Sequence, residues 1–63
     1  MKVGDLIKVP MGAVTSLDLK TDIAVLVEKV PRSDVYEYDW LVFIDGRHVQ
    51  MGRQIEVSAE VLA

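Results

Sequence analysis

The chain has no cysteine and no asparagine, a single histidine, and no apolar run longer than five residues. Without cysteine it has no disulfide, no thiolate nucleophile and no cysteine-based zinc site, which favours a reducing compartment. A membrane-spanning helix needs roughly 20 apolar residues, and Asp5 stands where a signal peptide requires an apolar stretch. We therefore expect a soluble, cytoplasmic protein.

What the chain does contain is typical of one small folded domain spanning residues 1–63. Hydrophobic residues make up 51% of the sequence and the mean hydropathy is +0.26, too apolar for a disordered segment. A chain of this length buries only roughly 60% of its unfolded surface, so the core is small. The formal charge of −3 argues against non-specific binding to phosphate backbones.

Two apolar runs, 23–27 and 40–44, have the length and the β-branched content of strands. The second run ends at Asp45-Gly46, a dipeptide that accepts the positive φ angles of a tight hairpin turn. We therefore predict a hairpin over residues 37–51, with Asp45-Gly46 at its tip.

The remaining segments predict short strands joined by loops. Residues 6–9 form a strand stopped by Pro10, residues 10–22 form a long loop, and 55–57 alternates like a strand. Residues 58–62 fit either one helical turn or a continued strand. This pattern predicts an all-β fold, a small five-stranded antiparallel barrel. A sheet of three or four strands with a C-terminal helix is the alternative.

The two apolar runs do not alternate with polar residues, so apolar side chains must lie on both faces of the sheet. If the outward positions are Leu26, Trp40, Val42 and Ile44, they form a surface that another molecule has to cover. We therefore expect a homo-oligomer with these four residues at its interface. The alternative is that loop 10–22 or the C-terminal segment covers the outer face.

Four segments of the chain, 3–8, 24–28, 41–47 and 55–57, resemble small SH3-like barrel proteins encoded by tailed phages, including those of marine cyanophages. The resemblance covers most of the chain. It implies an SH3-like barrel and, for a phage-encoded protein, a place in the host cytoplasm.

A narrower resemblance concerns residues 51–55, which are similar to the second half of the Sm-like signature. Gly52 and Ile55 match that pattern, whereas Met51 stands where an arginine is usual. Sm-like proteins form rings that bind single-stranded RNA, so the resemblance implies a ring and an RNA partner.

The polar residues do not suggest catalysis. His48 is the only histidine, and a metal site usually needs three or four converging ligands. The serines stand in loop or cap contexts and no nucleophile motif is present. We expect no enzymatic activity, no metal and no cofactor.

All three arginines lie in the second half of the chain, next to aromatic residues at alternate positions 36, 38 and 40. Arginine binds phosphate and stacks on bases, and aromatic rings can also stack on bases. We therefore expect nucleic-acid binding at one end of the barrel, by Arg32, Arg47, His48, Arg53 and Tyr36. The alternative function is a protein-interaction or structural module of phage origin that binds no nucleic acid.

Overall fold

The fold is known from a computed structural model that describes residues 1–32 and 37–63. The elements follow one another as β1 (Leu6–Lys8), α1 (Met11–Ser16), β2 (Ile23–Pro31), β3 (Tyr38–Ile44), β4 (Arg47–Met51), α2 (Ile55–Ser58) and β5 (Glu60–Val61). The five strands form one antiparallel sheet in the order β4-β3-β2-β1-β5. The all-β, five-stranded antiparallel prediction is confirmed, and closure of this sheet into a barrel stays a prediction.

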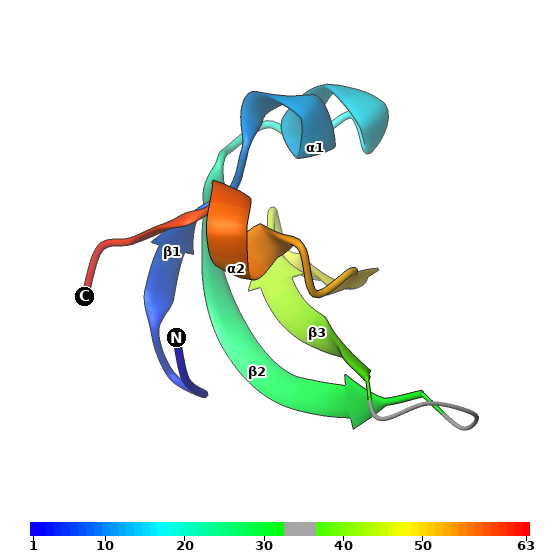
Figure 1. Ribbon diagram of the computed structural model, residues 1–63. Coiled ribbons are helices and arrows are strands. Elements are labelled where there is room, and N and C mark those ends of the chain that lie inside the picture. Colours follow the sequence, from blue (N-terminus) through cyan, green and yellow to red (C-terminus); the bar gives the residue numbers. More distant parts are fainter. Residues whose placement is uncertain (33–36) are drawn as a thin grey trace.

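β2 bends strongly along its length and carries the curvature of the sheet (Figure 1). Its pairing with β3 shifts register between Leu26 and Glu28, which marks a β-bulge. A bulge adds one residue to a strand and so reverses which positions face inward. Leu26 is buried before the shift, and Lys29 lies opposite Trp40 after it. The bulge therefore moves a charged residue onto the same face as the aromatic residues of β3.

The hairpin predicted over residues 37–51 is confirmed, with β3 and β4 joined at Asp45-Gly46. Both turn residues have positive φ, 53° for Asp45 and 76° for Gly46, as a two-residue turn of this kind requires. The turn also contacts the segment after α1: Lys20 donates its backbone N–H to the Asp45 carboxylate at 3.2 Å, and Arg47 donates to the carbonyl of Leu17 at 2.8 Å. These contacts fix the turn against the segment that connects α1 to β2.

Two local predictions are wrong. Residues Met11–Ser16 form a short helix inside the expected loop, because the Pro10 carbonyl accepts hydrogen bonds from the N–H groups of Ala13 and Val14. The segment expected as strand 55–57 is α2, and the chain becomes extended again only in β5. In a strand Ile55 and Val57 would share one face, whereas here Ile55 is buried and Val57 is 90% exposed. In the described ranges no helix is long and apolar enough to cross a bilayer.

The oligomer interface predicted at Leu26, Trp40, Val42 and Ile44 is also wrong. Each of these side chains is at most 1% exposed in the single chain, and together they form the centre of the core. They occupy the inner face of the curved sheet, where buried residues from the connections and from α2 cover them: Val9, Leu19 and Ile55. One copy of the chain therefore hides these residues by itself.

Some of the apolar residues that remain exposed lie on the opposite face of the same strands. Ile23 is 38% exposed, and Val25 lies directly opposite Phe43, which is 42% exposed. The Phe43 ring meets the His48 ring edge-on, with centroids 5.2 Å apart. Apolar residues thus do occupy both faces, as the sequence predicts, but the outward set is the reverse of the expected one. Self-association stays a prediction.

The reversed assignment of faces predicts different costs for one substitution at two sites. Ile44→Val deletes a buried methylene and should lower the free energy of unfolding by about 0.5–1.5 kcal/mol. Ile23→Val makes the same change at an exposed position and should alter it by less than about 0.5 kcal/mol. Urea denaturation followed by Trp40 fluorescence measures both. Equal costs would contradict the burial of Ile44 by a single copy.

The turn geometry predicts opposite effects for two glycine substitutions. A Cβ at Gly46 meets no atom within 4 Å, so Gly46→Ala should destabilise only through its positive φ, by about 1–2 kcal/mol. Gly12 lies in α1 with equal space around it, and Gly12→Ala should be neutral or stabilising by up to about 1 kcal/mol. Thermal and urea unfolding of both variants test the difference. A harmless Gly46→Ala would contradict the assigned turn.

Candidate functional site

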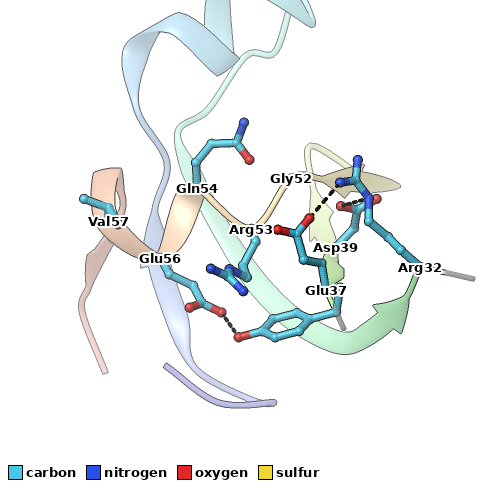
Figure 2. A pocket seen from close by; sticks show the side chains of 9 residues that line it. Arg32, Glu37, Asp39, Gly52, Arg53, Gln54, Glu56 and Val57 are labelled. Atoms are coloured by element: carbon cyan, nitrogen blue, oxygen red, sulfur yellow. Dashed lines mark hydrogen bonds and ion pairs between the residues drawn. The ribbon is translucent and has the colours of Figure 1, made fainter. Parts of the chain in front are cut away.

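A groove of about 520 Å³ lies between the β2–β3 connection and the segment that leads from β4 into α2 (Figure 2). On one side it is bounded by the end of β2 and the start of β3, and on the other by α2 and the residues before it. Its lining consists of Arg32, Glu37, Tyr38, Asp39, Gly52, Arg53, Gln54, Glu56 and Val57. Segments far apart in the sequence therefore build one polar concavity with an exposed apolar residue, Val57, beside it.

Two aromatic residues of β3 lie beneath and beside this groove. Tyr38 and Trp40 share one face of the strand because they are two residues apart, and their rings meet edge-on with centroids 5.9 Å apart. The Lys29 ammonium lies 4.5 Å from the centre of the Tyr38 ring and 5.5 Å from that of Trp40. Trp40 is fully buried, so among the described residues Tyr38 is the one aromatic side chain in the groove lining.

Glu56 joins α2 to these aromatic residues. One oxygen, Oε1, accepts hydrogen bonds from the Tyr38 hydroxyl and, at 2.7 Å, from the Trp40 indole N–H. The hydrogen bond to Glu56 raises the pKa of Tyr38, and partial desolvation adds to the rise. The hydrogen bonds from Tyr38 and Trp40 lower the pKa of Glu56. The pair therefore favours a neutral phenol and an ionised carboxylate.

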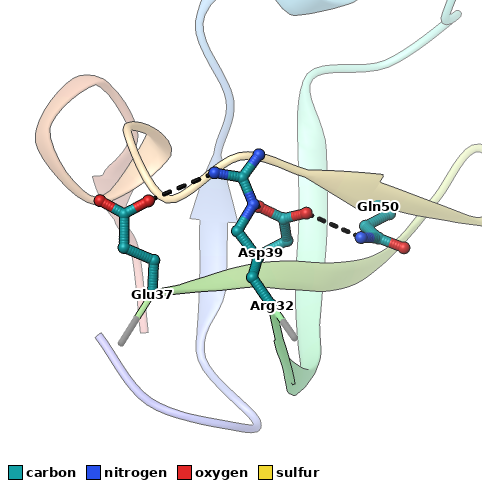
Figure 3. A network of polar contacts seen from close by, with 4 residues as sticks. All are labelled: Arg32, Glu37, Asp39 and Gln50. Atoms are coloured by element: carbon teal, nitrogen blue, oxygen red, sulfur yellow. Dashed lines mark hydrogen bonds and ion pairs between the residues drawn. The ribbon is translucent and has the colours of Figure 1, made fainter. Parts of the chain in front are cut away.

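On the opposite wall of the groove, Arg32 contacts two carboxylates. Glu37 stands just before β3, and Asp39 belongs to β3. Its Nη1 lies 3.3 Å from Glu37 Oε2 and its Nε lies 3.4 Å from Asp39 Oδ1. Asp39 also accepts a hydrogen bond from Gln50 Nε2 at 2.7 Å and is only 14% exposed (Figure 3). Asp39 is thus a fixed acceptor, whereas the pair formed by Arg32 and Glu37 is half-exposed.

Arg53 is the second guanidinium of the groove. Its side chain projects between Glu56 and Glu37 in Figure 2, with the guanidinium carbon 5.8 Å from the centre of the Tyr38 ring. The lining therefore holds three carboxylates and two guanidinium groups, a formal charge of −1. The charge of the groove has the same sign as the charge of the whole chain.

The predicted nucleic-acid residues are only partly brought together. Arg32 and Arg53 share the groove, but Arg47 lies at the turn end of β4 and contacts Leu17, and His48 lies on the outer face against Phe43. The expected single cluster at one end of the barrel is wrong. Arg47 and His48 open β4, whereas the groove begins only after the last residue of that strand, Met51. Tyr36 falls outside the described residues.

The sequence-based prediction did not assign Glu37, Tyr38, Asp39, Gly52 and Gln54 to the site, nor the α2 residues Glu56 and Val57. A strand over 55–57 would have placed them on opposite faces of a sheet, far from any particular partner. One sequence signal does point towards Glu56: the N–H of a buried tryptophan needs an acceptor. Choosing Glu56 among the ten acidic residues of the chain requires the three-dimensional fold.

Comparison with models of protein families, with characterised proteins and with solved structures found no match to this chain. Across residues 1–32 and 37–63, no group of three or more histidine, aspartate or glutamate side chains is placed to hold a metal ion. The groove is therefore interpreted from its own residues alone.

The Tyr38–Glu56 hydrogen bond predicts a defined dependence on pH. The lowered pKa of Glu56 adds stability that is present above its ordinary value of 4.5 and is lost as the pH falls through the folded pKa. The raised pKa of Tyr38 adds stability below pH 10.0 that is lost as the pH rises through its folded value.

Glu56→Gln should therefore lower the pKa of Tyr38 towards its ordinary value and weaken the loss of stability in acid. Absorbance titration in a Tyr36→Phe background isolates the Tyr38 phenol. Glu60→Gln, which removes the same charge from exposed β5, should leave the Tyr38 titration as it is in the parent. An unchanged Tyr38 pKa in Glu56→Gln would refute the assigned contact.

Proposed function

We propose that the protein is a non-enzymatic interaction module whose groove binds an extended segment of a partner protein. The observation that carries this proposal is the groove itself, because its volume of about 520 Å³ lies within the range of roughly 300–1,000 Å³ usual for binding pockets. Its lining combines an exposed apolar side chain, an aromatic ring and charges of both signs. Such a mixture suits a peptide, which offers apolar, polar and charged groups along one strand.

The charge of the groove favours a protein partner over a nucleic acid. Binding of a phosphate backbone depends on net cationic surface, whereas carboxylates outnumber guanidinium groups in the groove. Arg32 already contacts two of these carboxylates. A polyanion in the groove would therefore meet repulsion from Glu37 and Glu56 as well as attraction to the arginines.

The aromatic residues give little support to base stacking. Trp40 is buried, and the Tyr38 ring already has Lys29 and Arg53 against it. A base that stacked on the same ring face as either cation would have to displace that cation. Single-stranded RNA binding stays the second candidate, because Arg32, Arg53 and Tyr38 do share one groove and the Sm-like resemblance implies such a ligand.

The titration behaviour of the groove supports the non-enzymatic part of the proposal. A general acid or base works best when its pKa lies near the working pH. Tyr38 and Glu56 are shifted in the opposite sense, with the pKa of the phenol raised and that of the carboxylate lowered. Near neutral pH, neither group is poised to exchange a proton with a substrate.

Selection from a random display library of twelve-residue peptides tests the proposal. We expect enriched peptides that bind with roughly micromolar Kd, a value usual for weak transient contacts, and that shift the Trp40 indole N–H signal in NMR spectra. Val57→Ser should weaken binding by about threefold or more through lost apolar contact.

The matched control is Val3→Ser, which alters another exposed valine outside the groove lining and should leave binding unchanged. Oligo-U and single-stranded DNA at low salt form the competing arm. If no peptide is enriched, the proposed function is wrong. If only oligo-U shifts the groove signals, RNA binding replaces it.

A further inference from the structure

The groove already holds one cationic side chain in the manner expected of a ligand. Arg32 reaches two carboxylates through different nitrogens, Nη1 to Glu37 and Nε to Asp39 (Figure 3). Each carboxylate receives one guanidinium nitrogen, and of the two contacts the one to Glu37 is a hydrogen bond. The acceptors are ready in place, because Gln50 holds the nearly buried Asp39.

We propose that the partner segment carries an arginine or lysine that takes the place of Arg32 on Glu37 and Asp39. Arg32 is then an internal competitor that occupies the cation site in the free protein. This inference rests on the proposed docking function and specifies the chemistry of the partner.

Displacement of Arg32 costs little because Arg32 is held only weakly. Its side chain is about half exposed, and exposed ion pairs contribute little since water and salt screen them. When Arg32 swings into solvent, the groove retains three carboxylates against Arg53 alone, a formal charge of −2. The negative charge of the whole chain also attracts a basic segment during encounter.

The two candidate functions predict opposite effects of removing Arg32. If Arg32 contacts phosphate, Arg32→Gln weakens the binding of oligo-U. If Arg32 competes with a partner cation, the same change strengthens the binding of a basic peptide. The sign of one measurement thus separates a direct contact from an internal competitor.

The experiment measures the affinity of peptides selected by the wild-type chain, first for the wild-type chain and then for its variants. We expect the selected peptides to be enriched in arginine and lysine, and Arg32→Gln to bind them about two- to fivefold tighter at low salt. Asp39→Asn, which removes the fixed acceptor charge, should weaken binding by about threefold or more. The gain from Arg32→Gln should shrink as salt rises to about 0.5 M.

Lys20→Gln is the matched control, because it removes one positive charge away from the groove lining and should change affinity by less than the Arg32 variant. Arg32→Lys keeps the charge but replaces the two nitrogens that contact Glu37 and Asp39 by a single ammonium group, so it should increase the affinity by less. This variant replaces Arg32→Gln in the test if Arg32→Gln fails to fold. Two results would overturn the competitor role while the docking function stands. One is a set of selected peptides that is not enriched in arginine or lysine, and the other is that both Arg32 variants bind the peptides no more tightly than the wild-type chain does. A library that yields no binder at all refutes the docking function instead.

Discussion

The burial of Trp40 is the constraint on which the rest of the structure depends. Trp40 has the largest side chain of the protein, and that side chain is fully buried in the core of one small domain. A buried indole N–H without an acceptor would destabilise the fold. Glu56 meets this need, which draws α2 against β3 and brings its carboxylate beside Tyr38. The groove exists because the core requires α2 to lie there.

How much the sequence predicts depends on whether a feature is local. The Asp45-Gly46 turn follows from backbone chemistry alone, so the hairpin and its boundaries are predictable. The inward face of β2 and β3 is not, since both sets of alternate positions are apolar and either could be buried. Which set is buried depends on the segments that pack over one face of the sheet. These segments are distant in sequence and include Leu19 and Ile55. Choosing the wrong set turned core residues into a predicted interface.

The site follows the same division. Arg32 and Arg53 were predicted to act together and do share the groove, but the prediction added Arg47 and His48, which lie at the opposite end of β4 from Arg53. Strand geometry separates the two ends of β4, so nearness in sequence misleads here. The pairing of Arg32 with Glu37 and Asp39 spans the β2–β3 connection, and the role of Glu56 depends on a helix that its alternating pattern disguised. Charge balance in the groove can be judged only after these contacts are known.

The reversal of faces also changes what the apolar excess implies. Had Trp40 and its neighbours pointed outward, a partner would have been obligatory. The residues that point outward from β2 and β3, Ile23, Val25 and Phe43, are each only about two-fifths exposed, and the other exposed apolar side chains, such as Val3, Met11 and Val57, lie elsewhere on the chain. Three such side chains supply far less than the roughly 800 Å² per partner of a standard interface, and scattered exposure of this kind is ordinary for a monomer. The outer face of β2 and β3 therefore does not by itself require a covering neighbour, and the charged groove is the surface on which the proposed function rests.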